Sequence, residues 1–282
     1  MRKSVYWVKS FGLVALLLAS MLISACQPRA AIPATGAEVT FTATDYAFEA
    51  PDQLDAGIVT VTLQNNGQEV HHLQFMKLNQ DVTFEQFTSA LQESEAAALP
   101  LVEFTGGAGA IPPGQSEQVM VELEPGNYVI ACFITDADGV PHLAHGMIAP
   151  LTVVESSNQA VEAPAPDQTV TLKDFEFELP QSIQSGRQIW EVVNNGPQPH
   201  EFTIVRLAEG KTMDDVAAFM QSPDGPPPFV EAGGMQALSV GKRGWAILDL
   251  QPGNYVAVCF VPDPDTGKAH VELGMVMPFT VP

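Results

Sequence analysis

The sequence predicts an all-β protein built from two tandem Greek-key β-sandwich domains, each with one short inserted helix. Three observations predict this fold. Short stretches of alternating apolar and polar residues recur along the chain, and turn-forming residues separate them. The whole pattern then occurs a second time, so the chain contains two similar stretches of about 115 residues each. This repeat is much longer than the units of solenoid proteins, so it indicates a duplicated domain.

The first 25 residues read as a targeting segment rather than as part of the fold. Arg2, Lys3 and Lys9 precede an apolar run that is too short for a comfortable membrane span of roughly 20 residues. The run ends at Ile23-Ser24-Ala25-Cys26, which resembles the lipobox of bacterial lipoproteins. By that resemblance residues 1–25 are a lipoprotein signal peptide and Cys26 is the lipidated residue. The alternative is an ordinary secretory signal with an incidental cysteine.

Composition then divides the remaining chain. Residues 26–37 are expected to form a tether, and residues 156–167, with Pro164 and Pro166, a linker between the domains. The first domain is predicted at 38–155 and the second at 168–282.

The elements follow the same order in both domains. Each opens with an alternating strand, followed by a second strand, an Asn-Asn-Gly turn, a helix, a glycine pair and a Pro-Gly-Asn-Tyr turn. Thr83 with Gln86 and Thr212 with Asp215 are spaced as capping boxes, which predicts helices beginning at Thr83 and at Thr212. The predicted strands are 39–43, 59–63, 170–175 and 189–193, the helices end near residues 98 and 220, and the turns are 65–67, 125–128, 194–196 and 252–255.

Two sets of metal-binding residue types repeat in the same order. The first set is His71, Cys132, His142 and Met147, and the second is His200, Cys259, His270 and Met275. The gaps are 61, 10 and 5 residues in the first set and 59, 11 and 5 in the second. Two imidazoles, a thiolate and a thioether are the ligands of a blue-copper electron-transfer centre, which is trigonal with a weak axial methionine.

Strand alternation and the repeat decide between neighbouring histidines. His71 shares a face with Leu73 and Phe75, the predicted core face, so His72 is expected to point to the surface. Leu273 stands in the second copy where His145 stands in the first, which favours His142 as the ligand.

Cysteine usage and charge limit the possible functions. An exported chain meets oxidising conditions, yet it keeps only Cys132 and Cys259 after the N-terminal segment, one in each copy, so metal thiolates are favoured over a disulfide or inert cysteines. Without residues 1–25 the chain has 9 basic and 33 acidic residues, a net charge of −24. This excludes nucleic acid as a partner and is compatible with a basic protein partner as well as with a plain acidic surface.

These motifs resemble the cupredoxin family, in particular plastocyanin and azurin-like blue copper proteins. The resemblance rests on Asn-Asn-Gly followed by histidine, Pro-Gly-Asn-Tyr followed by cysteine, and a histidine with a methionine five residues later. It covers nearly all of both domains and implies up to two copper ions, one for each set. One departure is the length of the loop between cysteine and second histidine, with nine residues in one copy and ten in the other. Such loops resemble the type 1 site of two-domain copper nitrite reductases.

The function expected from the sequence is one-electron transfer through type 1-like copper sites, by a protein held outside the cytoplasm through its lipid anchor. The partner would be a redox protein, for which a basic cytochrome is one option. His142 and His270 would be the points where electrons leave. The chain is expected not to be an enzyme, because Cys132 and Cys259 lack the flanking histidines of multicopper enzymes. Two alternatives stay open: a copper carrier or sensor, and a metal-free cupredoxin-like binding or assembly module.

Overall fold

The computed structural model describes residues 37–157, 161–222 and 224–282. The signal peptide, Cys26 and nearly all of the tether predicted from the sequence lie outside the described residues. None of the helices in the described part combines the length and the hydropathy needed to cross a bilayer.

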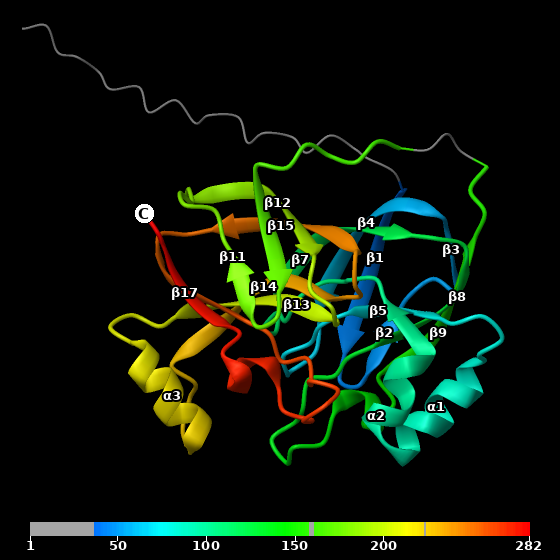
Figure 1. Ribbon diagram of the computed structural model, residues 1–282, viewed down its shortest axis with the longest axis horizontal. Helices are drawn as coiled ribbons and strands as arrows, with labels where there is room; N and C mark the ends of the chain where they lie inside the picture. Colours follow the sequence, from blue (N-terminus) through cyan, green and yellow to red (C-terminus); the bar gives the residue numbers. More distant parts are fainter. Residues whose placement is uncertain (1–36, 158–160, 223) are drawn as a thin grey trace, which may run out of the picture. The chain divides into compact units, whose positions relative to one another are not determined.

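The chain is mainly β, and its two halves repeat the same elements (Figure 1). The first half contains β1 (Ala37–Thr44), β2 (Ala47–Glu49), β3 (Gln53–Asp55), β4 (Gly57–Asn65), β5 (Gln74–Leu78), α1 (Phe84–Glu93), α2 (Glu95–Ala98), β6 (Val102–Phe104), β7 (Ser116–Leu123), β8 (Gly126–Ala131) and β9 (Ile148–Val154). The second half contains β10 (Gln168–Lys173), β11 (Glu176–Glu178), β12 (Gly186–Asn194), β13 (His200–Leu207), α3 (Met213–Gln221), β14 (Phe229–Leu238), β15 (Arg243–Leu250), β16 (Gly253–Val258) and β17 (Val276–Val281).

The strands form three sheets, one of which belongs to both halves. The shared sheet has eight strands in the order β11-β10-β12-β15-β7-β4-β1-β2. A five-stranded sheet (β3-β9-β8-β5-β6) packs on its first-half part, and a four-stranded sheet (β14-β13-β16-β17) packs on its second-half part. Each half is therefore a β-sandwich, and the predicted fold class of two cupredoxin-like sandwiches is confirmed.

One aromatic pair joins the two layers in the core of each sandwich. In the first half, Phe41 of the shared sheet meets Phe75 of the smaller sheet edge to face, with ring centroids 5.4 Å apart. In the second half, Trp190 stacks on Phe202 at 5.9 Å. All four side chains are fully buried, so these pairs fix how the layers face each other.

The two halves are joined by main-chain pairing at two places. Strand β7 pairs antiparallel with β15, and Val121 lies opposite Gly244. A second junction forms where the segment after β6 runs beside β14: Gly106 N–H donates to Ala237 O, and Gln236 N–H donates to Gly107 O. The predicted domains therefore share main-chain hydrogen bonds and one hydrophobic core.

Both predicted helix starts are confirmed as capping boxes. The Thr83 hydroxyl accepts from Gln86 N–H while the Gln86 side chain accepts from Thr83 N–H, and Thr212 and Asp215 make the same exchange. Each box satisfies amide groups that have no partner within the helix. In the first half the predicted helix is divided into α1 and α2, because Ser94 between them is extended.

A carboxylic acid is buried where the two halves meet. Glu117 of β7 accepts a hydrogen bond from Gly234 N–H of β14 at 2.6 Å, and its other oxygen has no partner among the described residues. Burial raises the pKa of Glu117 to about 8, against the lowering effect of the Gly234 and Gly109 amides. Gly233 must be glycine here, because a Cβ at that position would lie 2.2 Å from a Glu117 oxygen.

Candidate metal centres

The first predicted set converges into one buried group of donor atoms. Sγ of Cys132 lies 4.0 Å from Nδ1 of His71 and 3.6 Å from Nδ1 of His142, and the two Nδ1 atoms are 3.1 Å apart. All three residues are fully buried. The second set does the same: Nδ1 atoms of His200 and His270 are 3.0 Å apart, and Sγ of Cys259 is 3.3 Å from Nδ1 of His270.

This donor geometry fits a metal ion. The three atoms of the first group form a triangle whose centre is about 2 Å from each corner, which is the bond length that imidazole nitrogen and thiolate sulfur make with a divalent metal. Within the described part of the chain, two groups of His, Cys, Asp or Glu donors come this close together: His71, Cys132 and His142, and His200, Cys259 and His270. Two imidazoles and one thiolate are the equatorial donors of a type 1 copper centre.

Three segments place these donors. His71 follows the Asn-Asn-Gly turn, Cys132 directly follows β8, and His142 begins a 3-10 helix (His142–His145). That helix ends at Gly146, whose φ of 110° is favourable for glycine. Gly274, with a φ of 107°, ends the corresponding 3-10 helix (His270–Leu273).

The predicted methionine ligands come next in the chain and are both fully buried. Met147 donates its amide N–H to His142 O, and its carbonyl accepts from Cys132 N–H. Met275 makes the same two bonds with His270 and Cys259. The backbone thus ties each methionine to the cysteine and histidine of its own set. The axial role of the two thioethers remains a prediction.

Carboxylates orient the first histidine of each set. Nε2 of His71 donates to Asp45 at 2.7 Å, and Nε2 of His200 donates to Asp174 at 2.6 Å. A carboxylate only accepts hydrogen bonds, so the proton must be on Nε2 and the lone pair on Nδ1, which faces the cysteine. Such outer partners fix the tautomer and the ring orientation of metal-binding histidines.

Sequence reasoning missed Asp45 and Asp174, although the repeat carried a signal. Each precedes an aromatic residue at the same place in its copy, Tyr46 in one and Phe175 in the other. They lie far along the chain from the Asn-Asn-Gly turn, and only folding brings them beside it.

Gly67 and Gly196, the glycines of the two Asn-Asn-Gly turns, also leave space for neighbouring side chains. A Cβ on Gly67 would lie 2.3 Å from the Asp45 carboxylate and 2.7 Å from Nε2 of His71. A Cβ on Gly196 would lie 2.7 Å from Nε2 of His200. Asn65 and Asn194 hold the same loops: Asn65 donates to Ile111 O at 2.9 Å, and Asn194 donates to Leu238 O at 2.7 Å. The turn therefore leaves room for each histidine–aspartate pair.

Burial controls the protonation of the donors. It raises the pKa of Cys132 to about 12, although amide N–H groups of His72 and Ile134 oppose this, and it also raises the pKa of Cys259. Burial likewise lowers the pKa of His71 and of His200, and it lowers the pKa of His270 to about 4. The imidazoles of His71, His200 and His270 are therefore neutral and able to bind a metal, whereas the thiols must lose a proton to do so.

The two centres differ in the partner of the second histidine. Nε2 of His142 lies 2.9 Å from a carboxylate oxygen of Glu69, whereas Nε2 of His270 lies 3.1 Å from the amide oxygen of Gln198. The first centre thus has two carboxylates on its histidines and the second has one. Glu69 also accepts a hydrogen bond from the Tyr46 hydroxyl at 3.1 Å.

One sequence-based expectation about histidines is wrong. His72 is not a surface residue but is 6 % exposed, because its side of the chain is covered by the second half. His142 and His270 are both fully buried, with Nε2 beside Glu69 and Gln198, and their role as the points where electrons leave stays a prediction. His145 lies outside the donor triangle, stacked on the ring of Tyr46 at 4.5 Å.

Among solved structures, the chain is similar to single-domain blue copper proteins and to larger copper enzymes. Reduced auracyanin from Roseiflexus castenholzii matches 43 % of this chain and 98 % of its own, with 19 % identity and a TM-score of 0.29. The blue copper oxidase of Nitrosomonas europaea matches 82 % of this chain and 81 % of its own, with 17 % identity and a TM-score of 0.27. Copper nitrite reductase of the same organism matches 87 % and 93 %, with 14 % identity and a TM-score of 0.26. No protein-family model and no curated protein matches the chain.

The similarity to an oxidase and a nitrite reductase contradicts the expectation that the chain is not an enzyme. The absence of histidines beside Cys132 and Cys259 excludes one known arrangement of copper sites and does not exclude catalysis.

Proposed function

We propose that the chain carries two type 1-like copper centres, one on each His-Cys-His group, and passes single electrons through them. The observation that carries this proposal is the pair of buried donor triangles whose first histidines already have the tautomer a metal requires. Bound there, copper would supply a one-electron couple. The chain's own residues hold the imidazoles in place and keep water out, so little rearrangement accompanies a change of charge.

Burial favours this function over the alternatives. A carrier must release its metal, and donors that are fully buried and fixed through their outer hydrogen bonds suit a resident ion better. A metal-free module has no use for aspartates that orient Nδ1 of a histidine toward a cysteine in both halves. Redox titration of the copper-loaded chain tests the proposal: absorbance should be lost and recovered with one electron per bound copper. A chain that binds copper but is not reduced reversibly would contradict it.

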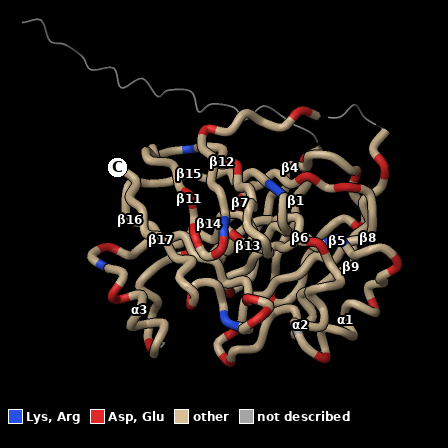
Figure 2. Tube along the Cα trace, viewed as in Figure 1, with Lys and Arg blue, Asp and Glu red and all other residues tan. Residues whose placement is uncertain are grey.

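The proposed partner is a redox protein that presents basic groups. Acidic side chains are spread along the described trace and basic ones are few (Figure 2), in keeping with 33 acidic and 12 basic residues in the whole sequence. Around the first centre, Asp45, Glu69 and Asp136 lie close to the histidines at its outer edge. Opposite charges speed the encounter of proteins and make its rate dependent on salt.

The centres are predicted to differ in reduction potential. The extra carboxylate at Glu69 stabilises the more positive oxidised centre, so the first centre should have the lower potential. Glu69 is 37 % exposed, and water screening limits the effect to about 1 kcal/mol, or about 40 mV for one electron. Glu69→Gln should raise the potential of the first centre, and Gln198→Glu should lower that of the second.

Spectroelectrochemistry can read each centre alone if the cysteine of the other is replaced by serine. Glu209→Gln, which removes an exposed carboxylate from the turn after β13, serves as a control for net charge. Shifts of equal size in the control and in Gln198→Glu, or shifts in the opposite direction, would contradict the predicted role of this position.

Membrane attachment through Cys26 is proposed on the Ile-Ser-Ala-Cys run, with the folded part outside the cytoplasm. Cys26→Ser should leave the protein unprocessed or release it from the membrane fraction. Cell fractionation with a size comparison measures this. An unchanged distribution and an unchanged size would rule out the anchor.

A further inference from the structure

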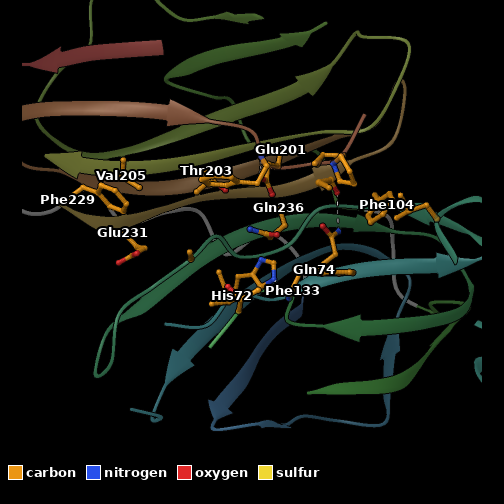
Figure 3. A pocket seen from close by; sticks show the side chains of 18 residues that line it. His72, Gln74, Phe104, Phe133, Glu201, Thr203, Val205, Phe229, Glu231 and Gln236 are labelled. Atoms are coloured by element: carbon orange, nitrogen blue, oxygen red, sulfur yellow. Dashed lines mark hydrogen bonds between the residues drawn. The ribbon is translucent and has the colours of Figure 1, made fainter. Parts of the chain in front are cut away.

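A cavity of about 440 Å³ opens between the two halves of the chain, and none of the metal-set residues lines it (Figure 3). Its size is within the range of small-molecule sites in proteins. Most of its wall is apolar and includes the rings of Phe104, Phe133, Phe229 and Phe260. Phe260 is 46 % exposed, which leaves a large apolar ring uncovered beside this space.

Each half contributes equivalent residues to this cavity. His72 and Glu201 each follow the first histidine of a metal set, and Phe133 and Phe260 each follow a metal-set cysteine. Phe133 N–H donates to Nε2 of His72 at 2.5 Å, and Phe260 N–H donates to a Glu201 oxygen at 2.6 Å. Figure 3 shows Gln236 between Glu201 and His72, and the Gln236 side chain hydrogen-bonds His72. Residues at equivalent positions of the two repeats thus line the cavity from both halves of the chain.

The charge of the lining has one sign. Glu201 and Glu231 both line the cavity, and no lysine or arginine is among the described residues of its wall. Neither carboxylate is ion-paired within the described part of the chain, and the second oxygen of Glu201, a residue 7 % exposed, is left without a hydrogen bond there. An anionic ligand would meet repulsion and would leave these acceptors unpaired.

The two carboxylates are at separate places along the cavity. Glu231 of β14 pairs with Val205 of β13, four residues beyond Glu201 on that strand. Four residues along a strand span about 13 Å. Phe229 lies on the same strand as Glu231, and the cavity between the two acidic positions is walled by Val205, Thr203 and Gln236. A ligand held at Glu231 would therefore extend along an apolar wall toward Glu201.

We propose that this cavity binds a small organic amine as its ammonium ion, with the charged group on Glu231 and an aromatic or alkyl body along Val205 and Thr203 toward Phe260. Three features carry the assignment: carboxylates without cations, rings that attract a cation over their faces, and an apolar wall that an ion alone would not fill. Amine binding in this cavity does not require a bound metal. It can therefore be tested separately from the proposed electron transfer.

A matched series of probes tests the charge requirement. Phenethylamine, 2-phenylethanol and phenylacetate share one ring and differ in charge. Calorimetric titration is made on the full mature chain without copper, because amines also bind copper ions. Phenethylamine should bind at least about tenfold more tightly than the alcohol, in line with a charged hydrogen bond, and phenylacetate should not bind. Equal binding of amine and alcohol, or binding of neither, would overturn the proposal.

Variants locate the site. Glu231→Gln should reduce phenethylamine binding to the level of the alcohol, and Phe260→Ala should weaken both ligands together. Glu122→Gln, which removes an exposed carboxylate from β7 outside the cavity, should leave both affinities unchanged. The circular dichroism spectrum checks that each variant is folded. Loss of amine binding in the Glu122 variant, or full binding in the folded Glu231 variant, would show that surface charge alone attracts the amine.

Discussion

Cys132→Ser is expected to abolish the visible absorption of the first centre, and Cys259→Ser that of the second. A thiolate bound to oxidised copper gives an intense charge-transfer band, and a serine hydroxyl cannot replace it. In the described part of the chain, only these two cysteines are available, and each lies within one donor triangle. Each single variant should therefore keep one centre's share of the absorbance, and the double variant should have none.

His145→Ala is the matched control for the cysteine variants. His145 is close to the first centre but is paired with Asp136 at 2.7 Å and lies outside the triangle. Its replacement should leave the band nearly intact. Full absorbance in the double cysteine variant would mean that the colour has another origin. A band lost in the His145 variant would place this histidine among the ligands.

Glu117→Gln is expected to stabilise the protein at high pH and to have much less effect at low pH. The pKa of Glu117 is about 8 in the folded chain, against an ordinary value of 4.5. Below pH 4.5 the Glu117 carboxyl is protonated in both the folded and the unfolded chain, so its ionisation does not change the free energy of unfolding. Between pH 4.5 and 8 the Glu117 carboxyl ionises in the unfolded chain but stays protonated in the folded chain. The free energy of unfolding therefore falls as pH rises. The free energy of unfolding that the wild type loses through this residue by pH 9 is of the order of 5 kcal/mol.

Urea unfolding of both proteins at several pH values between 4 and 9 measures this difference. Other groups titrate in the same range, but they cancel when the variant is compared with the wild type at each pH. Glu122→Gln, an exposed carboxylate on the same strand, should give a difference that hardly changes with pH. A Glu117→Gln difference that stays constant from pH 5 to 9 would show that the buried acid does not resist ionisation.

The helices and strands could be predicted because the sequence patterns that specify them lie within, or directly beside, each element. Capping boxes at Thr83 and Thr212 identify the helix starts, and the alternation of β1 and β10 identifies strands. The two His-Cys-His groups were also predictable, because duplication separates the four repeated ligand types from histidines that occur only once. His145 could be set aside in this way, since its counterpart is Leu273.

The joining of the two halves could not be predicted. Alternation along residues 71–75 placed His71 and Leu73 on the core face, but it could not indicate that the other face meets β14 of the second half. For this reason His72 was expected in solvent and is buried. Main-chain pairing between β7 and β15 leaves little trace in the sequence, because any non-proline residue can supply it.

The most direct test of the account is a copper count with a visible spectrum of the copper(II)-loaded chain that begins at Gln27. This chain keeps every residue that the structure describes. We expect two copper ions per chain and an intense thiolate-to-copper band that disappears on reduction and returns on oxidation. A chain without this band, whose Cys132 and Cys259 stay buried and unreactive in the presence of copper, would contradict the account and favour a metal-free cupredoxin-like module.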